Sequence, residues 1–352
     1  MAKAIGAKDI ATMLGVSRST VTRALNGDPV VNKETAAQVR SMAEKLGYRK
    51  NSLASGLVSG KTGMIGCIVP EIADPFYGEM VSLINAYMAS RNMHMLLGIF
   101  NEDEESADLL IKRFIDYRVE GMVLHDTFSG FLKTKVAILE NSGVPAVVMG
   151  DSSALGLDSV MGDDELGGYE IVSFLARNGY KRIAHIGDLA GTLQQRVVGY
   201  KRALLENNLR YLPEYLVNCR QPNRMHDVVS GLLSLAEPPD AIFCDNDIIA
   251  MEVMSALAFH GVQIPDQMGV VGFDNIAMSS QLAVPLTTVD LNVREIVNKA
   301  LEFLMERIET QRAGGGLPIK PRNVKIPPRL CIRSTTKVLE NSNVEETGAI
   351  AF

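Results

Sequence analysis

The chain has 352 residues, of which 35 are Lys or Arg and 41 are Asp or Glu, so its net charge is −6. Apolar residues make up 47% of the chain, which predicts a globular protein of two or three domains. No run approaches the roughly 18 apolar residues of a membrane span, and MAKAIGAKDI lacks the apolar core of a secretory signal peptide. Four scattered cysteines form no CxxC pair, which excludes a zinc ribbon and predicts reduced thiols in a cytoplasmic protein.

Charge is distributed unevenly along the chain. Residues 1–62 hold ten basic and four acidic side chains, a net charge of +6, so the remaining 290 residues carry −12. A basic segment on an acidic body indicates a polyanionic partner at one end of the chain. An ordinary solvated face is the alternative that charge alone leaves open.

The first 46 residues predict three short helices. Residues 8–14 place apolar side chains on one face and end at Gly15. Ser17 is a good N-cap for a second helix that runs through Leu25. A third helix is predicted over residues 33–46, and the Ser/Gly-rich residues 49–62 that follow predict a linker.

After residue 63 short apolar runs alternate with longer amphipathic ones. Strands are predicted at residues 64–70, 94–100, 121–126, 145–151, 158–162, 182–187, 240–245 and 269–274. Helices are predicted at residues 77–91, 104–118, 133–141, 165–178, 194–207, 225–236, 248–260 and 293–310. This alternation predicts an α/β core of two similar lobes, each with a doubly wound parallel sheet. Ligands bind such sheets at the carboxyl ends of the strands, so a pocket is expected between the lobes.

The stretch GVSRSTVTRALNG (15–27) predicts a helix-turn-helix, in which two helices meet at a tight glycine-containing turn. The outward side chains of its second helix are predicted to be Arg18, Ser19, Thr22 and Arg23. Arginine can donate two hydrogen bonds to a guanine edge. Ser17, Thr20 and Asn26 suit phosphate contacts. A solvent-exposed helical hairpin with incidental arginines is the alternative.

The run DIATMLGVSRSTVTRALNG resembles the N-terminal signature of the lactose-repressor (LacI/GalR) family of bacterial transcription regulators. LGYRKNSLASGL resembles the family's hinge. TGMIGCIVPEIADPFY resembles the first strand and loop of the family's ligand-binding core, and LCIRSTT resembles the closing strand of that core. QQRVVGY, AIFCDND, VVGFDN and PLTTVD fall between them in the family's order. The resemblance spans residues 7–336. It implies an N-terminal three-helix DNA-binding domain followed by a two-lobed, periplasmic-binding-protein-like (type I) core.

The resemblance assigns DNA-contacting positions to two segments. Arg18, Ser19 and Arg23 match the positions that read the major groove. The hinge contributes Asn51, Ala54 and Leu57, of which the leucine matches a residue that wedges into the minor groove. The hinge departs from the family at three positions, Lys50, Ser55 and Gly56, and the glycine costs about 1 kcal/mol of helix stability relative to alanine. This hinge is therefore expected to be weakly helical without DNA.

The resemblance also places an effector pocket. Arg196, Asn246 and Asp274 match the family's ligand contacts, and such a set suits a polyhydroxylated ligand, because the carboxylate accepts from hydroxyl groups and the guanidinium donates in a fork. Three further candidates follow first-lobe strands: Phe76, Asp126 and Asp151. Two alternatives stay open, namely a helix-capping role for Asn246 and a core position for Phe76.

The sequence contains no catalytic set: HExxH, GxSxG and P-loop motifs are absent. We therefore expect no enzyme activity, no cofactor and no metal site. A solute-binding protein and a sugar- or nucleotide-converting enzyme share the α/β pattern, but the helix-turn-helix favours a transcriptional regulator, most simply a repressor. Its expected partners are a second copy of the chain, a pseudo-palindromic operator and a small effector, with sugars ahead of purines and nucleosides. Whether the effector releases or strengthens operator binding is left open.

The expected domain organisation follows from these patterns. The predicted domains are a helix-turn-helix domain (1–48), a hinge (49–62), a first lobe (63–162 and 292–323), a second lobe (163–291 and 324–336) and a tail (337–352). The tail has no leucine heptad, so no coiled-coil tetramer is expected.

Overall fold

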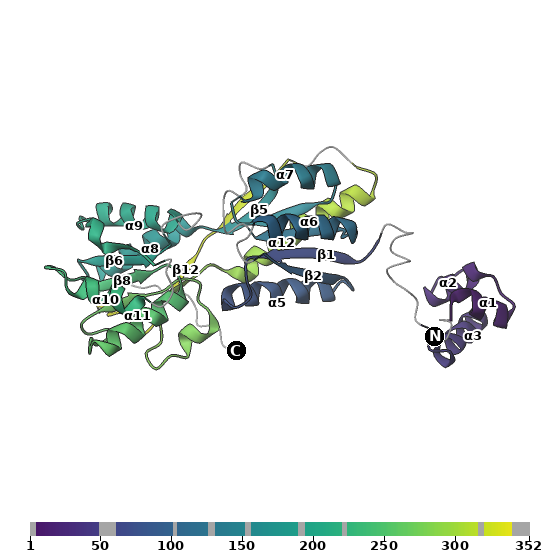
Figure 1. The fold of residues 1–352 in the computed structure, drawn as a ribbon, viewed down its shortest axis with the longest axis horizontal. Helices are drawn as coiled ribbons and strands as arrows, with labels where there is room; N and C mark the ends of the chain where they lie inside the picture. The colour runs from purple at the N-terminus through teal and green to yellow at the C-terminus, as the bar shows by residue number, and fades with distance from the viewer. Residues whose placement is uncertain are drawn as a thin grey trace. The chain divides into compact units, whose positions relative to one another are not determined.

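The computed structural model describes residues 5–48, 61–100, 104–125, 131–151, 156–188, 194–219, 224–315 and 320–339. The chain forms two compact units, which meet in sequence between residues 62 and 63 (Figure 1). Within the described residues no helix is long and apolar enough to cross a membrane.

The first unit is a bundle of three helices, α1 (Ala7–Leu14), α2 (Arg18–Leu25) and α3 (Lys33–Lys45). The Ser17 Oγ begins α2 by accepting a hydrogen bond of 3.0 Å from a first-turn amide. Gly15, with φ of 65°, makes the left-handed turn between α1 and α2. The predicted helices are confirmed. Their shared core consists of Ile10, Ala11, Val21, Ala24, Ala36, Val39 and Ala43.

The second unit contains two lobes. The first lobe has six parallel strands in the order β11-β5-β4-β3-β1-β2. The strands are β1 (Met64–Val69), β2 (His94–Ile99), β3 (Gly121–His125), β4 (Ala146–Met149), β5 (Asp158–Gly162) and β11 (Asn323–Ile326). The helices are α5 (Pro75–Ala89), α6 (Glu104–Asp116), α7 (Phe131–Ser142) and α12 (Val293–Arg312).

The second lobe has four parallel strands in the order β7-β6-β8-β9. The strands are β6 (Ile183–Gly187), β7 (Leu216–Asn218), β8 (Ala241–Cys244) and β9 (Gly269–Val271). The helices are α8 (Asp164–Arg177), α9 (Gln194–Glu206), α10 (Met225–Leu233) and α11 (Asp247–Phe259), with short 3-10 turns η2 (Pro213–Tyr215) and η3 (Ala277–Ser280). An antiparallel pair, β10 (Thr288–Asp290) and β12 (Arg329–Cys331), completes the unit.

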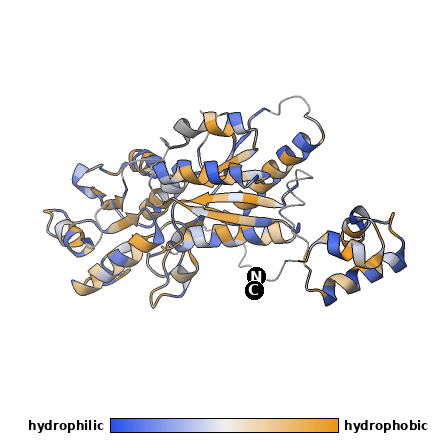
Figure 2. Ribbon diagram, turned by 45° about the vertical axis from the view of Figure 1, so that its right-hand side comes forward, coloured by the Kyte–Doolittle hydropathy of each residue, from blue (hydrophilic) through white to orange (hydrophobic). Residues whose placement is uncertain are grey.

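Strands β1, β3, β4 and β5 of the first lobe are almost wholly buried, as the sequence predicts for a doubly wound sheet, whereas the edge strands β2 and β11 are partly exposed. Along β1 successive side chains alternate between two cores: Ile65 packs with the side of the sheet that α5 and α12 cover, and Met64 and Ile68 pack with the side that α6 covers. Figure 2 shows these strands as mainly hydrophobic, whereas the helices carry both hydrophobic and hydrophilic residues. The α/β fold class is therefore confirmed.

Three short strands, β7, β10 and β11, were not predicted. Each has only three or four residues and includes polar ones, so none forms an apolar run in the sequence. The predicted boundary between residues 323 and 324 falls inside β11. Because the β11 backbone pairs with β5 through Ile326, the strand stays in the first lobe and the chain crosses between lobes after it.

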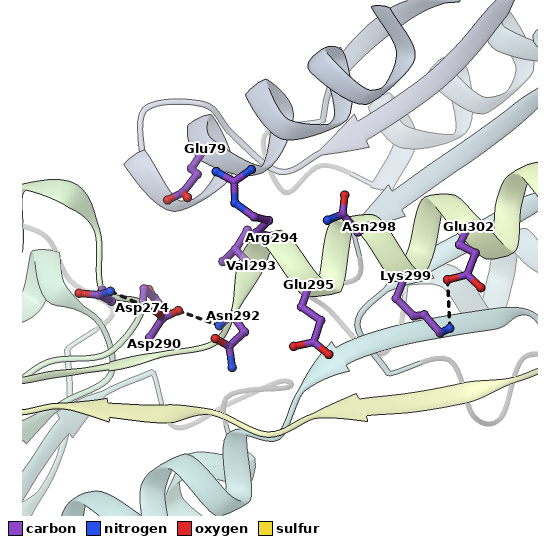
Figure 3. A pocket seen from close by; sticks show the side chains of 11 residues that line it. Glu79, Asp274, Asp290, Asn292, Val293, Arg294, Glu295, Asn298, Lys299 and Glu302 are labelled. Carbon is purple, nitrogen blue, oxygen red and sulfur yellow. Dashed lines mark hydrogen bonds and ion pairs between the residues drawn. The ribbon is translucent and has the colours of Figure 1, made fainter. Parts of the chain in front are cut away.

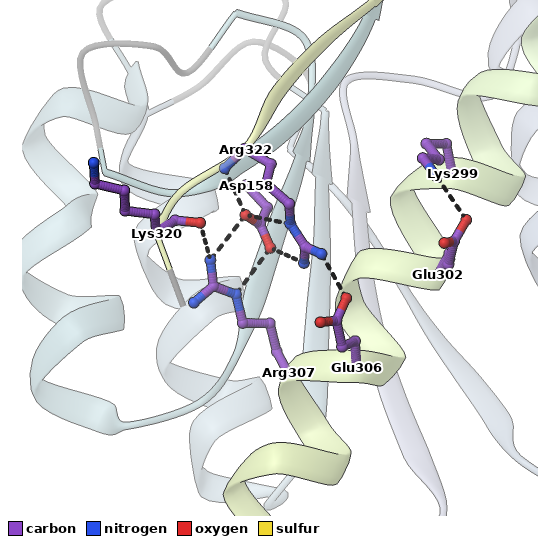
Figure 4. A network of polar contacts seen from close by, with 7 residues as sticks. All are labelled: Asp158, Lys299, Glu302, Glu306, Arg307, Lys320 and Arg322. Carbon is purple, nitrogen blue, oxygen red and sulfur yellow. Dashed lines mark hydrogen bonds and ion pairs between the residues drawn. The ribbon is translucent and has the colours of Figure 1, made fainter. Parts of the chain in front are cut away.

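An ion-pair network fastens helix α12 to two strands of the first lobe (Figure 4). The buried Asp158 carboxylate at the start of β5 accepts two hydrogen bonds of 2.8 Å from the Arg307 guanidinium of α12. It also accepts from the Arg322 backbone amide at 2.8 Å and from Arg322 Nη2 at 2.9 Å, just before β11. Burial by itself raises the pKa of Asp158, but the hydrogen bonds from the two arginines outweigh it and lower the pKa to about 2.

We predict that Asp158→Asn lowers the free energy of unfolding by about 2–3 kcal/mol at neutral pH. The folded-state pKa lies below the unfolded value near 4, so the ionised carboxylate stabilises the fold above that value, and the contribution is lost as the pH falls toward 2. Urea unfolding from pH 7 to pH 3 checks this. A difference from the wild type that does not shrink in acid would contradict it.

Helices α8 and α9 approach each other closely because of two glycines. A methyl group at Gly168 would clash with the carbonyl oxygen of Arg196, and one at Gly199 would clash with the carbonyl oxygen of Glu165. Each clash involves backbone, which no side-chain rotation relieves. The glycine pair therefore sets how near α9 lies to the N-terminal end of α8.

We predict that Gly199→Ala lowers the free energy of unfolding by at least about 2 kcal/mol, since the helices would have to separate. Gly231→Ala in α10 is the matched control, because its methyl group would meet no atom within 4 Å. The control should be neutral or stabilising by up to about 1 kcal/mol. Urea unfolding of both variants tests the pair, and equal effects would argue against the close-approach explanation.

Candidate functional site

Helix α2 presents a polar face to solvent. Val21 and Ala24 are buried in the bundle core, whereas Arg18, Ser19 and Arg23 on the other face are exposed. No described residue forms a hydrogen bond or ion pair with the Arg18 guanidinium, so its donors are available. Arg23 pairs with Asp28 at 3.8 Å. This face therefore carries two exposed arginines, five residues apart along α2.

The hydroxyl side chains around α2 have local roles. The Ser17 Oγ caps the helix and lies 2.7 Å from Ser19 Oγ and 2.8 Å from Thr20 Oγ1. Thr22 Oγ1 donates to the Arg18 carbonyl at 3.0 Å, and Asn26 follows the helix in an exposed position. The helix N-terminus, with its positive end of the macrodipole, is therefore exposed beside three hydroxyl groups.

Four predicted contacts lie outside the described residues. They are Asn51, Ala54 and Leu57 of the hinge and Asp126 after β3. The three atypical hinge residues (Lys50, Ser55 and Gly56) also lie outside them.

The Arg196 side chain is the centre of the second candidate site. It is 6% exposed, its Nε donates to Asp164 Oδ1 at 2.7 Å, and its Nη2 lies 3.5 Å from Asp274 Oδ1. Nη1 donates to the Asp245 carbonyl, and the guanidinium stacks over the Phe273 ring at 3.7 Å. Burial by itself would lower the pKa of Arg196, but the three carboxylates raise it above its usual value, so the side chain stays charged.

Asp274 lies just beyond β9 in an unusual backbone conformation, with φ of 98°. Its side chain is 8% exposed, and within the described part of the chain its Oδ1 accepts no hydrogen bond. Burial raises the pKa of this carboxyl well above its usual value; Arg196 opposes that shift and nearby acids, including Asp74, add to it. Its Oδ1 is therefore held by charge attraction to Arg196 Nη2 at 3.5 Å and not by a hydrogen bond of good geometry.

Asp74, in the first lobe, interacts electrostatically with Arg196 in the second lobe. Its Oδ1 accepts from the Phe76 amide at 2.9 Å and caps α5. Burial raises its pKa, and the positive charge of Arg196 on α9 opposes that shift. Charges from both lobes therefore meet here. The sequence analysis missed Asp74, because Asp-Pro is the ordinary start of a helix and does not by itself indicate a ligand contact.

A cavity of about 570 Å³ opens beside Asp274 (Figure 3). Its walls come from α5, from the loop after β9, and from β10 and the first half of α12. The lining residues are Glu79, Asp274, Asn275, Asp290, Asn292, Val293, Arg294, Glu295, Asn298, Lys299 and Glu302. Among the predicted effector contacts that the structure describes, Asp274 alone is on this wall, and Arg196 contacts the Asp274 carboxylate.

The other predicted effector contacts occupy different settings. Phe76 is half-buried against the core and meets the Tyr77 ring edge-on at 5.3 Å. Asn246 caps α11 by accepting from the Ile249 amide at 2.8 Å, so its oxygen is already used. Asp151 is exposed beyond β4.

Two buried aspartates beside Arg196 support the loops without lining the cavity. Asp245 accepts from the Asp188 amide at 2.6 Å, and Asp247 accepts from Thr288 Oγ1 and from the Ile276 amide. Burial raises the pKa of Asp247 to about 6. Asp245 follows β8 directly and Asp247 begins α11, and their hydrogen bonds hold the loops after neighbouring strands together.

Comparison with known proteins identifies both parts of the chain. Residues 7–51 match the family described as bacterial regulatory proteins, lacI family, and residues 172–336 match the periplasmic binding protein-like domain. The HTH-type transcriptional repressor PurR of Aliivibrio fischeri is 30% identical over 313 residues, covering 86% of this chain and 91% of that protein. Catabolite control protein A of Priestia megaterium is 29% identical over 340 residues, covering 94% and 98%.

Two solved structures share the fold. The lac repressor dimer bound to operator and the anti-inducer ONPF aligns with a TM-score of 0.84 at 22% identity, over 96% of this chain and all of that one. The transcriptional regulator CelR in complex with cellobiose aligns with a TM-score of 0.69 at 22% identity, over 94% and 99%.

The helix-turn-helix unit and the two-lobed core together define a DNA-binding transcription regulator. The chain belongs to the lacI family of bacterial regulatory proteins. That family consists of regulators rather than enzymes, and within the described residues no three His, Cys, Asp or Glu side chains are grouped to hold a metal ion.

We predict that Arg196→Met lowers the free energy of unfolding by about 3–5 kcal/mol at neutral pH, because it leaves buried carboxylates without their counter-ion. The pKa of Asp274, already raised, should rise further, so protonation at pH 5 should recover part of the loss. Urea unfolding at both pH values measures this. Arg202→Met is the control, since Arg202 is 42% exposed in its pairs with Glu165 and Glu206, and its loss should cost at most about 1 kcal/mol. An equal loss at both pH values for Arg196→Met would contradict the explanation.

Proposed function

We propose that this regulator is a repressor whose affinity for its operator is set by a small carbohydrate, or a derivative of one, bound between the two lobes. The observation that carries this proposal is the Arg196 cluster: a buried guanidinium ion-paired at 3.5 Å with the buried Asp274 carboxylate, which lines a cavity. A carboxylate accepts from sugar hydroxyls, and a guanidinium donates in a fork. The cellobiose held by CelR, which shares the fold, supports a sugar as the ligand class.

In this proposal the α2 face reads the operator. Arg18, Ser19 and Arg23 contact base edges in the major groove, where arginine pairs with guanine. Ser17, Thr20 and Asn26 contact phosphates and fix the register. The hinge residues Asn51, Ala54 and Leu57 would add minor-groove contacts.

The active form is proposed to be a homodimer. Two copies of α2 must reach two half-sites, so the operator should be pseudo-palindromic. A ligand that binds one lobe arrangement better than the other shifts the population toward that arrangement, and the dimer transmits this shift to its two hinges.

We predict that Arg18→Ala weakens binding to the operator by about tenfold or more and reduces discrimination against a scrambled duplex. Fluorescence anisotropy with labelled DNA from upstream of the protein's own gene, over a salt series, measures both. Lys45→Ala is the control, because Lys45 is an exposed basic residue in the last turn of another helix, α3. Equal losses in the two variants would mean that the arginine contributes only general charge.

The same assay tests the effector. A panel of mono- and disaccharides, with purine bases and nucleosides beside them, is added to the operator complex. A sugar that shifts the operator affinity supports the proposal, and the direction of the shift separates an inducer from a co-repressor. A response to a purine or nucleoside alone would overturn the carbohydrate assignment.

A further inference from the structure

Asp28 stands just beyond the C-terminal end of α2, beside one of the two arginines of the exposed helix face. Gly27, with φ of 74°, turns the chain back after the last helical turn. The Asp28 amide then donates to the Arg23 carbonyl oxygen at 3.0 Å. The turn therefore fixes the backbone of Asp28 against the residue that its side chain faces.

The other polar groups of Asp28 leave one oxygen for the arginine. Its carbonyl accepts from the Val31 amide at 3.1 Å, and its Oδ1 accepts from the Val30 amide at 3.0 Å. Its Oδ2 lies 3.8 Å from Arg23 Nε. The loop itself orients the carboxylate, so the acid is held in place independently of the ion pair.

The negative charge of Asp28 is not required by the turn. A neutral asparagine accepts the same hydrogen bond from the amide two residues further on. The C-terminal end of a helix carries the negative end of the macrodipole, which disfavours a carboxylate there. The side chains of Arg23 and Asp28 are 57% and 33% exposed, and so open an ion pair contributes little to folding stability. The charge therefore acts mainly on the Arg23 guanidinium.

An arginine on a DNA-reading face has two kinds of partner. A phosphate attracts it by charge and carries no sequence information, whereas the guanine edge offers the neutral acceptors O6 and N7. A carboxylate beside the guanidinium repels a phosphate far more than it affects a neutral base edge. On Arg23 the Nε side faces Asp28, and no described residue forms a hydrogen bond or ion pair with its Nη groups. These groups form the fork that fits guanine.

We propose that Asp28 is a positioning residue that makes Arg23 a reader of guanine and not a phosphate contact. It attracts the Nε side of the guanidinium, which leaves the Nη fork for the base edge, and it disfavours the approach of phosphate oxygens. Asp28 therefore lowers the affinity for DNA in general and raises the preference for the operator. This inference rests on the proposed function and deepens it, because it assigns part of the specificity of α2 to a residue outside that helix.

Asp28→Asn in the full-length protein tests the proposal, because asparagine keeps the acceptor for the Val30 amide and removes only the charge. Fluorescence anisotropy with the upstream DNA of the protein's own gene and with a scrambled duplex gives the ratio of the two affinities. The variant should bind the scrambled duplex more tightly, and the ratio should fall by about threefold to tenfold as the arginine loses its fixed orientation.

Glu34→Gln is the matched control. Glu34 is an exposed acid in the first turn of α3, so its replacement removes the same charge from the same three-helix unit. The control should strengthen binding to both duplexes by a similar factor and leave the ratio unchanged. An equal fall of the ratio in Glu34→Gln and Asp28→Asn overturns the proposal, because general charge would then explain both.

A double-mutant cycle with Arg23→Ala separates positioning from a structural role. Without the arginine, Asp28→Asn should change the ratio by less than about twofold. Operator duplexes with single base-pair changes sharpen the test, since Asp28→Asn should relax discrimination at the base pair where Arg23→Ala does and at no other. A full fall of the ratio in the Arg23→Ala background, or relaxation at other base pairs, overturns the proposal.

The outcomes also separate this inference from the proposed function. A wild-type protein without preference for the operator contradicts the proposed function, and with it the role of Asp28. A wild-type preference that Asp28→Asn leaves unchanged contradicts only the role of Asp28. A response of the operator complex to a purine in place of a sugar changes the effector class and leaves the role of Asp28 standing.

Discussion

The arrangement of the ligand-binding core depends on one buried cation. Arg196 holds Asp164 and Asp274 close together where neither carboxylate would be stable alone. Gly168 and Gly199 make this possible, because only residues without a side chain allow α8 and α9 to approach so closely. The guanidinium therefore neutralises the second lobe internally and also forms the base on which a ligand would rest.

The excess of acid around that cation gives the cleft its chemical character. Asp74 caps the start of α5 in the first lobe, and α12, anchored near its other end by Asp158, contributes Glu295 and Glu302 to the cavity wall. A ligand that binds one arrangement of the lobes better than another would shift the population toward that arrangement, which is the requirement for a switch.

The three-helix unit that would contact DNA is separate from the two-lobed core and has its own small hydrophobic core. The small core of the first unit contains only short apolar side chains, which suffice to hold three helices and leave the polar face of α2 exposed. That division fits the charge of the chain, positive over the first 62 residues and negative beyond them. Attraction to phosphate is confined to one end, while the acidic core is repelled by DNA and stays available to small molecules.

The sequence by itself determined what depends on near neighbours along the chain. The Ser17 cap, the exposed face of α2 and the buried strands of both lobes follow from capping chemistry and from the spacing of apolar residues. Arg196 and Asp274 could be named from their motifs. Only the tertiary structure decided that Asp164, Asp74 and Phe273 gather around them, and that Asn246 uses its oxygen to cap α11. These residues come from separate strands and helices, so their distances depend on how helices pack and where the chain crosses between lobes, which no local pattern records.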